Sequence, residues 1–215
     1  CSIGDFHSVE INLDALVTPP TISPIVPRED IHGWFDWPKL YEDVARRTPN
    51  DGHLVEVGSW LGKSACFLAE LIKAYGKHIR LDCIDMWNDT AIEPAYQEHI
   101  NLARIQNSSL LGLFSSNLSR YDVLDYVHPI QAISWEAACQ YHNESLDMVF
   151  IDAAHDYSSV CRDITAWWPK VKSGGIFAGH DYHYSQDGVQ RAVNEFFTMI
   201  QRPFLVKGQC WYVEK

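Results

Sequence analysis

Two short groups of acidic and imidazole side chains directly follow apolar runs of this sequence. Asp152 ends one apolar run and His155 comes three residues later, while His180 and Asp181 end another run. If the two runs are neighbouring parallel strands, the four side chains meet at one edge of a sheet, where such sheets bind ligands. Carboxylates and imidazoles gathered there can hold a divalent cation or move a proton. The structural alternatives are a helix cap for Asp152 and a hydrogen-bonded core histidine for His180.

A glycine-containing turn joins an apolar strand pattern at 53–57 to a helical pattern. Gly58 allows a sharp turn, Gly62 removes a Cβ where a ligand or the helix must come close, and Ser64 can cap the helix. The turn is not a phosphate-binding P-loop, because its two glycines are one residue too close, and Trp60 breaks the GxGxxG pattern. Strand, glycine turn and helix in this order still favour a nucleotide-cradling arrangement.

Two acids lie close to this turn. The strand pattern at 79–84 ends in Asp85, about 27 residues after Gly58, where dinucleotide-binding folds place an acid on the ribose hydroxyls. A loop cap is the alternative for Asp85, and its order and distance from the turn favour the ribose. Glu56 lies inside the first strand pattern, where an acid needs a cationic or hydrogen-bonding partner. The ammonium group of an amino-acid-bearing cofactor is one such partner.

From residue 53 onward, short β-type runs alternate with helical patterns, which is typical of a parallel sheet with crossover helices. Two short strand patterns around Gly208 predict a terminal hairpin. The expected fold class is therefore α/β, with a doubly wound and mostly parallel sheet. We expect strands near 53–57, 79–84, 127–132, 147–151 and 174–179, and helices near 63–75, 92–106, 134–142, 157–168 and 186–201.

The first 32 residues are expected to form an extended arm ahead of one domain at 33–215, because prolines in the arm fix φ and remove backbone donors. Pro38 suits the first turn of a helix that follows the arm.

Several segments are candidates to line a cleft for a second ligand. The aromatic cluster after the arm, with His32, Trp34 and Trp37, either fills a sheet edge or lines the cleft. Residues 88–120, interrupted at 107–109, are expected to include a mobile lid. His183 and Tyr184 are expected beside the cleft.

Composition limits the classes of partner. The 215 residues include 17 basic and 28 acidic side chains, a formal net charge of −11, which argues against a phosphate-tracking surface and against nucleic acid. The length suits one domain with its own core. Without a run of about 20 apolar residues or a signal-peptide pattern, we expect no membrane contact, a soluble cytoplasmic protein, and six reduced cysteines. Whether the chain forms a homo-oligomer stays open.

Four segments in order carry a resemblance to a known family: 55–64, 83–87, 148–155 and 173–182. With the terminal hairpin, they resemble a class I S-adenosylmethionine-dependent methyltransferase from about residue 33 to the end. The similarity is closest to the small-molecule O-methyltransferase branch, which includes metal-dependent catechol-type and macrolide-sugar enzymes. The resemblance implies a Rossmann-like, seven-stranded sheet with an antiparallel C-terminal hairpin.

The resemblance also implies which residues bind S-adenosylmethionine. Gly58 and Ser59 would lie beside the methionine portion, and Asp85 would hold the ribose. The turn at Trp60 departs from relatives that keep a glycine there. The full expected set of cofactor-binding residues is Glu56, Gly58, Ser59, Gly62, Ser64, Asp85, Trp87, Ile133 and Ser134, of which the last three would flank the adenine.

Metal-dependent relatives place one acid after the fourth strand and an adjacent pair after the fifth. Here these are Asp152 and the pair His180 and Asp181, in which His180 departs from the usual acid or amide. A divalent metal, Mg or Mn, would therefore bind Asp152, His180 and Asp181. We expect His155 to act as the catalytic base beside Asp152, because an imidazole pKa near ~6.5 suits proton abstraction at neutral pH.

The expected activity is methyl transfer from S-adenosylmethionine to a hydroxyl of a small polar molecule, such as a sugar or a natural-product intermediate. The alternatives are an NAD-dependent oxidoreductase, since both cofactors use a ribose acid, and a non-catalytic methyltransferase-like binding protein. The terminal hairpin and the lack of GxGxxG weigh against the oxidoreductase.

Overall fold

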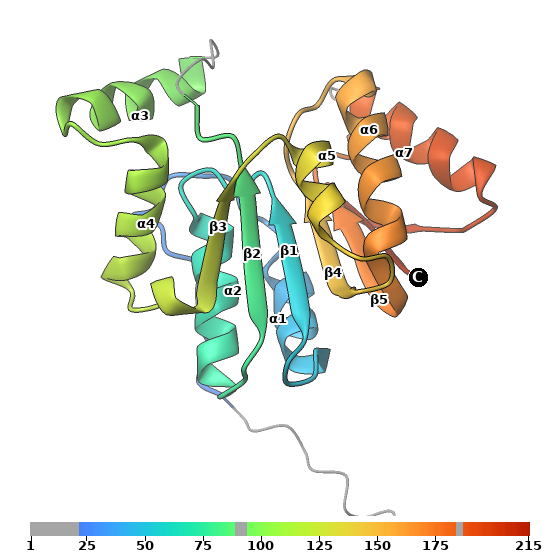
Figure 1. Ribbon diagram of the computed structural model, residues 1–215, viewed down its shortest axis with the longest axis horizontal. Coiled ribbons are helices and arrows are strands. Elements are labelled where there is room, and N and C mark those ends of the chain that lie inside the picture. The colour runs from blue at the N-terminus through green and yellow to red at the C-terminus, as the bar shows by residue number, and fades with distance from the viewer. Residues whose placement is uncertain (1–21, 89–93, 184–186) are drawn as a thin grey trace, which may run out of the picture.

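The computed structural model describes residues 22–88, 94–183 and 187–215, and within them the centre is a seven-stranded sheet (Figure 1). The strand order is β3-β2-β1-β4-β5-β7-β6; β1 to β5 run parallel, and β7 is antiparallel to β5 and β6. This confirms the expected mostly parallel α/β sheet with a terminal hairpin. The strands are β1 (His53–Val57), β2 (Arg80–Asp85), β3 (Val127–Gln131), β4 (Leu146–Ile151), β5 (Val171–Gly179), β6 (Leu205–Lys207) and β7 (Cys210–Glu214).

The strands β1 and β4 lie side by side where the strand order reverses. From β1 the chain builds β2 and β3 on one side and then crosses to β4 and β5 on the other. Just past the strand ends, Gly58 N donates to Ile84 O over 2.7 Å and Asp152 N donates to Val57 O over 2.8 Å. Open α/β sheets bind ligands in the crevice outside the carboxyl ends at such a reversal. The fold therefore brings the glycine turn and Asp152 to the same crevice.

Helices cover both faces of the sheet because successive side chains of a buried strand point to opposite faces. One core forms around Leu54 and Phe150 with α1, α2 and α4, and the other around Val55 and Phe177 with α5, α6 and α7. The helices are α1 (Pro38–Arg47), α2 (Lys63–Ala74), α3 (Pro94–Ile105), α4 (Leu110–Arg120), α5 (Ser134–Ala137), α6 (Tyr157–Trp167) and α7 (Asp187–Met199). None of the helices in the described ranges is long and apolar enough to cross a membrane.

The expected lid at 88–120 is wrong for its second half, which is a separate helix. In α4, the side chains of Leu110, Phe114 and Leu118 are buried in the core. Ser109 begins this helix by accepting a hydrogen bond from Gly112 N over 3.0 Å, so the polar interruption is an N-cap. Residues 89–93 lie outside the described part of the chain, as do Tyr184 and the start of the last expected helix.

The helix expected at 134–142 is also shorter. It consists of α5 and one 3₁₀ turn, Ala138–Gln140, after which the chain extends toward β4. In Figure 1, α5 and α6 stand in front of β4 and β5 with α7 beside α6, and no helix of the described ranges stands in front of β2 and β3. Tyr141, just after the turn, instead reaches a polar cluster on this face of the sheet.

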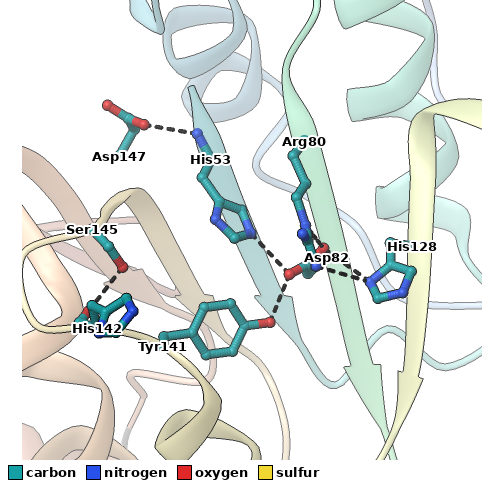
Figure 2. Close-up of polar contacts among 8 residues, drawn as sticks. All are labelled: His53, Arg80, Asp82, His128, Tyr141, His142, Ser145 and Asp147. Atoms are coloured by element: carbon teal, nitrogen blue, oxygen red, sulfur yellow. Dashed lines mark hydrogen bonds and ion pairs between the residues drawn. The ribbon is translucent and has the colours of Figure 1, made fainter. Parts of the chain in front are cut away.

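That polar cluster is centred on Asp82, a fully buried carboxylate in the middle of β2 (Figure 2). Oδ1 accepts from Arg80 Nε over 2.7 Å and lies 3.2 Å from His128 Nδ1. Oδ2 accepts from the Tyr141 hydroxyl over 2.7 Å and lies 2.8 Å from His53 Nε2. Burial would raise the pKa of Asp82, but the hydrogen bonds from its partners hold it well below the ordinary value.

The described residues ahead of α1, 22–37, have neither helix nor strand; they include the end of the expected arm and the aromatic cluster, and are together called the arm below. The arm is nevertheless part of the core at its end, because Ile31 and Trp37 are 1% and 5% exposed. The guanidinium of Arg28 bonds Glu70 of α2 and lies over the ring of Tyr121, 4.5 Å from its centroid. The arm is thus anchored to the helices before it reaches the crevice. Residues 1–21 lie outside the described part.

Candidate active site

Two adjoining cavities open at the carboxyl ends of β1, β2 and β4. The His180 cavity, about 500 Å³, is lined by the glycine turn, the arm and the two acid–imidazole groups. The Asp85 cavity, about 380 Å³, is lined by the ends of β2 and β3, the glycine turn and α6. Both include Gly58, Trp60, Tyr96, Asp152 and Ala153, so they meet above the ends of β1 and β4.

Both glycines of the turn are required by close approach of protein atoms. Gly58 has φ +88°, and a Cβ there would lie 1.7 Å from the carbonyl oxygen of Asp152. Gly62 has φ +89°, and its Cβ would lie 2.5 Å from Leu118 Cδ1. Gly62 therefore admits α4, and it lines neither cavity. The backbone at Gly58 lines both.

The serines of the turn face the His180 cavity. Ser59 and Ser64 are 3% and 8% exposed, and Ser59 Oγ has no hydrogen-bond partner in the described part of the chain. The N-cap of α2 is Gly62, with no side-chain cap, so Ser64 does not serve as the helix cap. Both hydroxyls lie where the backbone turns toward the cavity, which suits contact with a polar ligand.

Glu56 lies beneath the turn and lines neither cavity. Its Oε2 accepts from the Tyr41 hydroxyl over 2.7 Å, while Oε1 has no hydrogen bond within the described residues. Burial raises the pKa of Glu56, and the nearby hydroxyls of Tyr41, Ser59 and Ser64 oppose the rise. Its expected contact with the cofactor stays a prediction.

The carboxylate of Asp85 links the two loops at the opening of its cavity. Oδ2 accepts from Trp60 N over 2.9 Å, and Oδ1 accepts from Trp87 N over 2.8 Å. Burial raises the pKa of Asp85, and these backbone N–H groups oppose the rise. Each carboxylate oxygen has lone pairs for a second hydrogen bond, so the acid can also accept from ligand hydroxyls in the cavity.

The rings near Asp85 have different roles. Trp87 is 4% exposed, and its Nε1 donates to Trp60 O over 2.7 Å, while its ring contacts Phe114 at 4.9 Å between centroids. The Trp87 ring therefore packs within the wall of the Asp85 cavity more than it offers its face to a ligand. Trp60 lines both cavities, and its Nε1 donates to His32 Nδ1 over 3.1 Å. Tyr96 of α3 meets the Trp60 ring edge-on at 4.8 Å.

The far wall of the Asp85 cavity contains two residues that sequence reasoning missed. Ile133 and Ser134 line it as expected, together with Trp135 and Asp163. Asp163 is 1% exposed on the apolar face of α6, beside Val160 and Trp167. Asp163 could have been found from the sequence, because an acid at a core position of an amphipathic helix needs a partner for its buried carboxylate.

The acid–imidazole groups converge in the His180 cavity as expected. Asp152, His155 and Asp181 each offer a ligand atom within 4.8 Å of the others. His155 Nε2 lies 2.9 Å from Asp181 Oδ2, and this contact raises the pKa of His155. Burial raises the pKa of Asp152. Burial would also raise the pKa of Asp181, but its contacts with His155 and His180 hold it well below the ordinary value.

His180 contacts acids on both of its ring nitrogens. Its Nε2 lies 3.0 Å from Asp36 Oδ1 of the arm, and its Nδ1 lies 3.4 Å from Asp181 Oδ2 and 3.9 Å from Asp152 Oδ1. Its ring lies against Trp37 at 4.5 Å between centroids. The side chain therefore links Asp36 to the two acids. Two sets of side chains have metal-ligand spacing in the described residues: Asp152, His155 and Asp181, and separately Asp36, His180 and Cys210. The expected metal set of Asp152, His180 and Asp181 stays a prediction.

The aromatic cluster divides between core and cavity. Trp37 is buried and stacks on Phe150 at 4.7 Å, so it does not line the cavity. His32 and Trp34 do line it, and Trp34 is 54% exposed. The arm thus supplies one wall of the His180 cavity, while α3 adds Tyr96.

Residues 55–182 match the model of a family described as a methyltransferase domain, which covers more than half of the chain. The chain belongs to this methyltransferase family. No curated protein matches the sequence. The matched segment contains the glycine turn and the acid–imidazole groups. It also contains every residue that lines the two cavities, except Gln209 and the residues of the arm.

Solved structures share the fold at low sequence identity. The O-methyltransferase NovP aligns with a TM-score of 0.62 at 19% identity, over 83% of this chain and 78% of NovP. CalS11, a TDP-rhamnose 3′-O-methyltransferase of calicheamicin biosynthesis, aligns with a TM-score of 0.54 at 15% identity, over 82% and 76%. SMU.1697c of Streptococcus mutans, a methyltransferase solved with S-adenosylhomocysteine (SAH), aligns at 0.56 and 14%, over 85% and 99%. At these identities the alignments establish the Rossmann-like methyltransferase fold.

Proposed function

We propose that this methyltransferase transfers the methyl group of S-adenosylmethionine to a hydroxyl of a small polar molecule, such as a sugar or a natural-product intermediate. The observation that carries the proposal is the junction of the two cavities. The cavity lined by Asp85, the expected ribose acid, meets the cavity that holds the His155–Asp181 pair, above Gly58 and Asp152.

The cofactor's chemistry matches the first cavity. Its ribose hydroxyls would donate to Asp85, and its adenine would lie against Ile133 and Ser134. The methionine portion would pass Gly58 toward Ser59, so the sulfonium would lie at the junction. The acids Asp36, Asp152 and Asp181 around the second cavity would attract that cation, and Lys63, the lysine of the same lining, is paired with Glu29.

Methyl transfer is an in-line displacement at carbon, so the protein must align the acceptor oxygen and remove its proton. The acceptor O–H proton passes to His155 as the new O–CH₃ bond forms and the S–CH₃ bond breaks. The products are a methyl ether, S-adenosylhomocysteine and an imidazolium that then releases its proton. Asp181 orients the His155 ring and stabilises its charge, while Asp152, which lines both cavities, can accept a hydrogen bond from the acceptor.

The acceptor is proposed to be a polyhydroxylated molecule. Trp34, Trp60 and Tyr96 offer aromatic faces, and the carboxylates nearby accept hydroxyl hydrogens. The same carboxylates repel an anionic acceptor. That NovP and CalS11 share the fold and carry O-methyltransferase names supports this substrate class.

The chain's own residues offer a divalent metal three donors, Asp152, His155 and Asp181, and this oxygen-rich set suits Mg or Mn. A bound metal would supply Lewis acidity that lowers the pKa of the acceptor hydroxyl. A metal that took His155 as a ligand would compete with its role as a base. Activity lost on chelation and restored by Mn²⁺ supports the metal; activity that survives exhaustive chelation leaves His155 as the base.

Isothermal titration calorimetry with S-adenosylhomocysteine and with NAD tests the proposal. We expect the former to bind and NAD not to bind, since the family is that of methyltransferases. Methyl transfer to a panel of sugars, nucleotide sugars and phenols then identifies the acceptor class. Binding of S-adenosylhomocysteine without transfer to any hydroxyl would favour the non-catalytic alternative, and no binding at all would refute the proposal.

A further inference from the structure

Asp163 is a buried carboxylate that the proposed reaction does not use. It lies on α6, is 1% exposed, and its Oδ1 has no hydrogen-bond partner in the described part of the chain. Leaving a buried carboxylate oxygen without a donor is costly, so such atoms in folded proteins usually mark a ligand or a function. Asp163 lines the Asp85 cavity, so a bound molecule can reach it.

Within the described ranges, no salt bridge joins Asp163 to a basic side chain. Ser134 Oγ accepts a hydrogen bond from Trp167 Nε1 over 3.0 Å, so the Ser134 hydroxyl can donate in turn to Asp163. The nearest basic residue in sequence, Arg162, places its guanidinium over the ring of Trp135 at 5.1 Å. Burial raises the pKa of Asp163 to about 6, and Ser134 only partly opposes the rise. A hydrogen-bond donor on a ligand would give the unpaired Oδ1 of Asp163 its missing partner.

The position of Asp163 indicates which ligand group would supply that donor. Asp85, at the end of β2, and Asp163, on α6, line the same cavity from different elements. If Asp85 holds the ribose, the attached base lies toward Ile133, Ser134 and Trp135. Adenine carries one exocyclic donor, its 6-amino group, whereas a 6-oxopurine carries an acceptor there.

We propose that Asp163 accepts a hydrogen bond from the 6-amino group of the cofactor's adenine and thereby selects a 6-aminopurine cofactor over a 6-oxopurine one. This inference rests on the proposed use of S-adenosylmethionine. A 6-oxopurine sets its carbonyl oxygen against the Asp163 oxygen, and two facing acceptors repel. Ser134 orients the carboxylate by donating to it, and Trp167 orients Ser134.

The test measures the affinities of S-adenosylhomocysteine and S-inosylhomocysteine, its 6-oxo counterpart, by calorimetry. We expect the wild-type chain to prefer the adenine compound by at least about tenfold. Asp163→Asn can turn an amide N–H₂ toward the cavity, so it should weaken binding of the adenine compound about 10-fold and shrink the preference. Asp156→Asn is the matched control, because Asp156 caps α6 through Ser159 N at 3.0 Å and does not line the cavity.

A purely structural role of Asp163 predicts a different result. In that case Asp163→Asn unfolds at a lower temperature without ligand, and the remaining folded protein keeps the wild-type purine preference; that result overturns the inference. If the variant does not fold, the ratio of the two affinities of the wild-type protein decides. Equal affinities for the two compounds would contradict the proposal that Asp163 recognises the 6-amino group. Wild-type protein that binds neither compound refutes the proposed function itself, whereas strong binding of both refutes only the role of Asp163.

Discussion

The strand β2 carries two acids three residues apart whose surroundings are opposite. Asp82, in the middle of the strand, receives donors on both oxygens from residues of its own chain (Figure 2). Asp85, at the carboxyl end, is held by two backbone N–H groups and faces a cavity. The pKa of Asp82 lies well below its ordinary value and that of Asp85 above it.

The same contrast extends to the other buried acids near the crevice. Glu56 and Asp163 each keep an oxygen without a hydrogen bond in the described residues. Acids whose charge is satisfied inside the chain stabilise the fold, while acids left unsatisfied cost stability and are retained for something the fold itself does not provide. The middle of β2 is thus suited to stability, and the carboxyl edge of the sheet to the proposed function.

The largest expected effect comes from comparing an imidazole of the crevice, His155, with an imidazole of the Asp82 cluster, His128. If His155, which pairs with Asp181, is the base proposed above, His155→Ala should lower turnover by about 10²–10⁴-fold while the affinity for S-adenosylhomocysteine stays nearly intact, because a base would contact the acceptor and not the cofactor. The matched variant is His128→Ala, which removes a partner of Asp82 and should leave turnover unchanged. Steady-state kinetics and calorimetry check both, and equal loss of turnover and affinity in His155→Ala would make that residue structural.

The next effect is on stability. Asp82→Asn should lower the free energy of unfolding by about 3 kcal/mol, because it removes the charge that Arg80 and the histidines surround. Urea denaturation at pH 7 measures it, with the exposed Asp125→Asn as control. Since the folded-state pKa of Asp82 is lowered, its contribution is present above pH ~4 and lost as pH falls below that value. A difference between wild type and variant that does not shrink in acid would contradict this account.

Asp163→Asn should act with the opposite sign. The pKa of Asp163 is raised to about 6, so the folded state binds the proton more tightly and stability is lost as pH rises from about 4 to about 6. The variant lacks this loss. It should therefore gain on the order of 1–3 kcal/mol relative to wild type between pH 4 and pH 7. Unfolding curves of both proteins at the two pH values test the point, and parallel curves would sink it.

The smallest expected effect sharpens the description of the Asp82 cluster. Tyr141→Phe removes one donor from a carboxylate that keeps its others, so the free energy of unfolding should fall by about 1 kcal/mol. Catalysis should not change. A loss as large as that of Asp82→Asn would show that Tyr141, and not the charge cluster, holds the chain before β4 to the sheet.

Most of the fold could be predicted from the sequence, because the hydrophobic periodicities of strands and helices are visible within short segments. β1 was predicted to the residue, and the other strand ends lie within about three residues of expectation. The helix α4 was missed because Ser109 was interpreted as part of a lid, although Leu110, Phe114 and Leu118 recur at the spacing of a buried helical face.

The candidate site was predicted less completely because it depends on where distant segments meet. The motifs located Asp85, Asp152, His155 and Asp181 at one crevice. They could not show that Asp36 of the arm reaches His180, since no local pattern encodes a contact across 144 residues of chain.

The carbonyl of Asp152 occupies the space that a side chain at Gly58 would need. The turn that would carry the cofactor and the strand end that carries Asp152 are therefore in direct backbone contact. Neither can be displaced without moving the other, so under the proposed reaction the distance between methyl donor and acceptor oxygen would be set by the main chain. Acceptor specificity can then diverge through the arm and α3 while the reaction geometry stays constant.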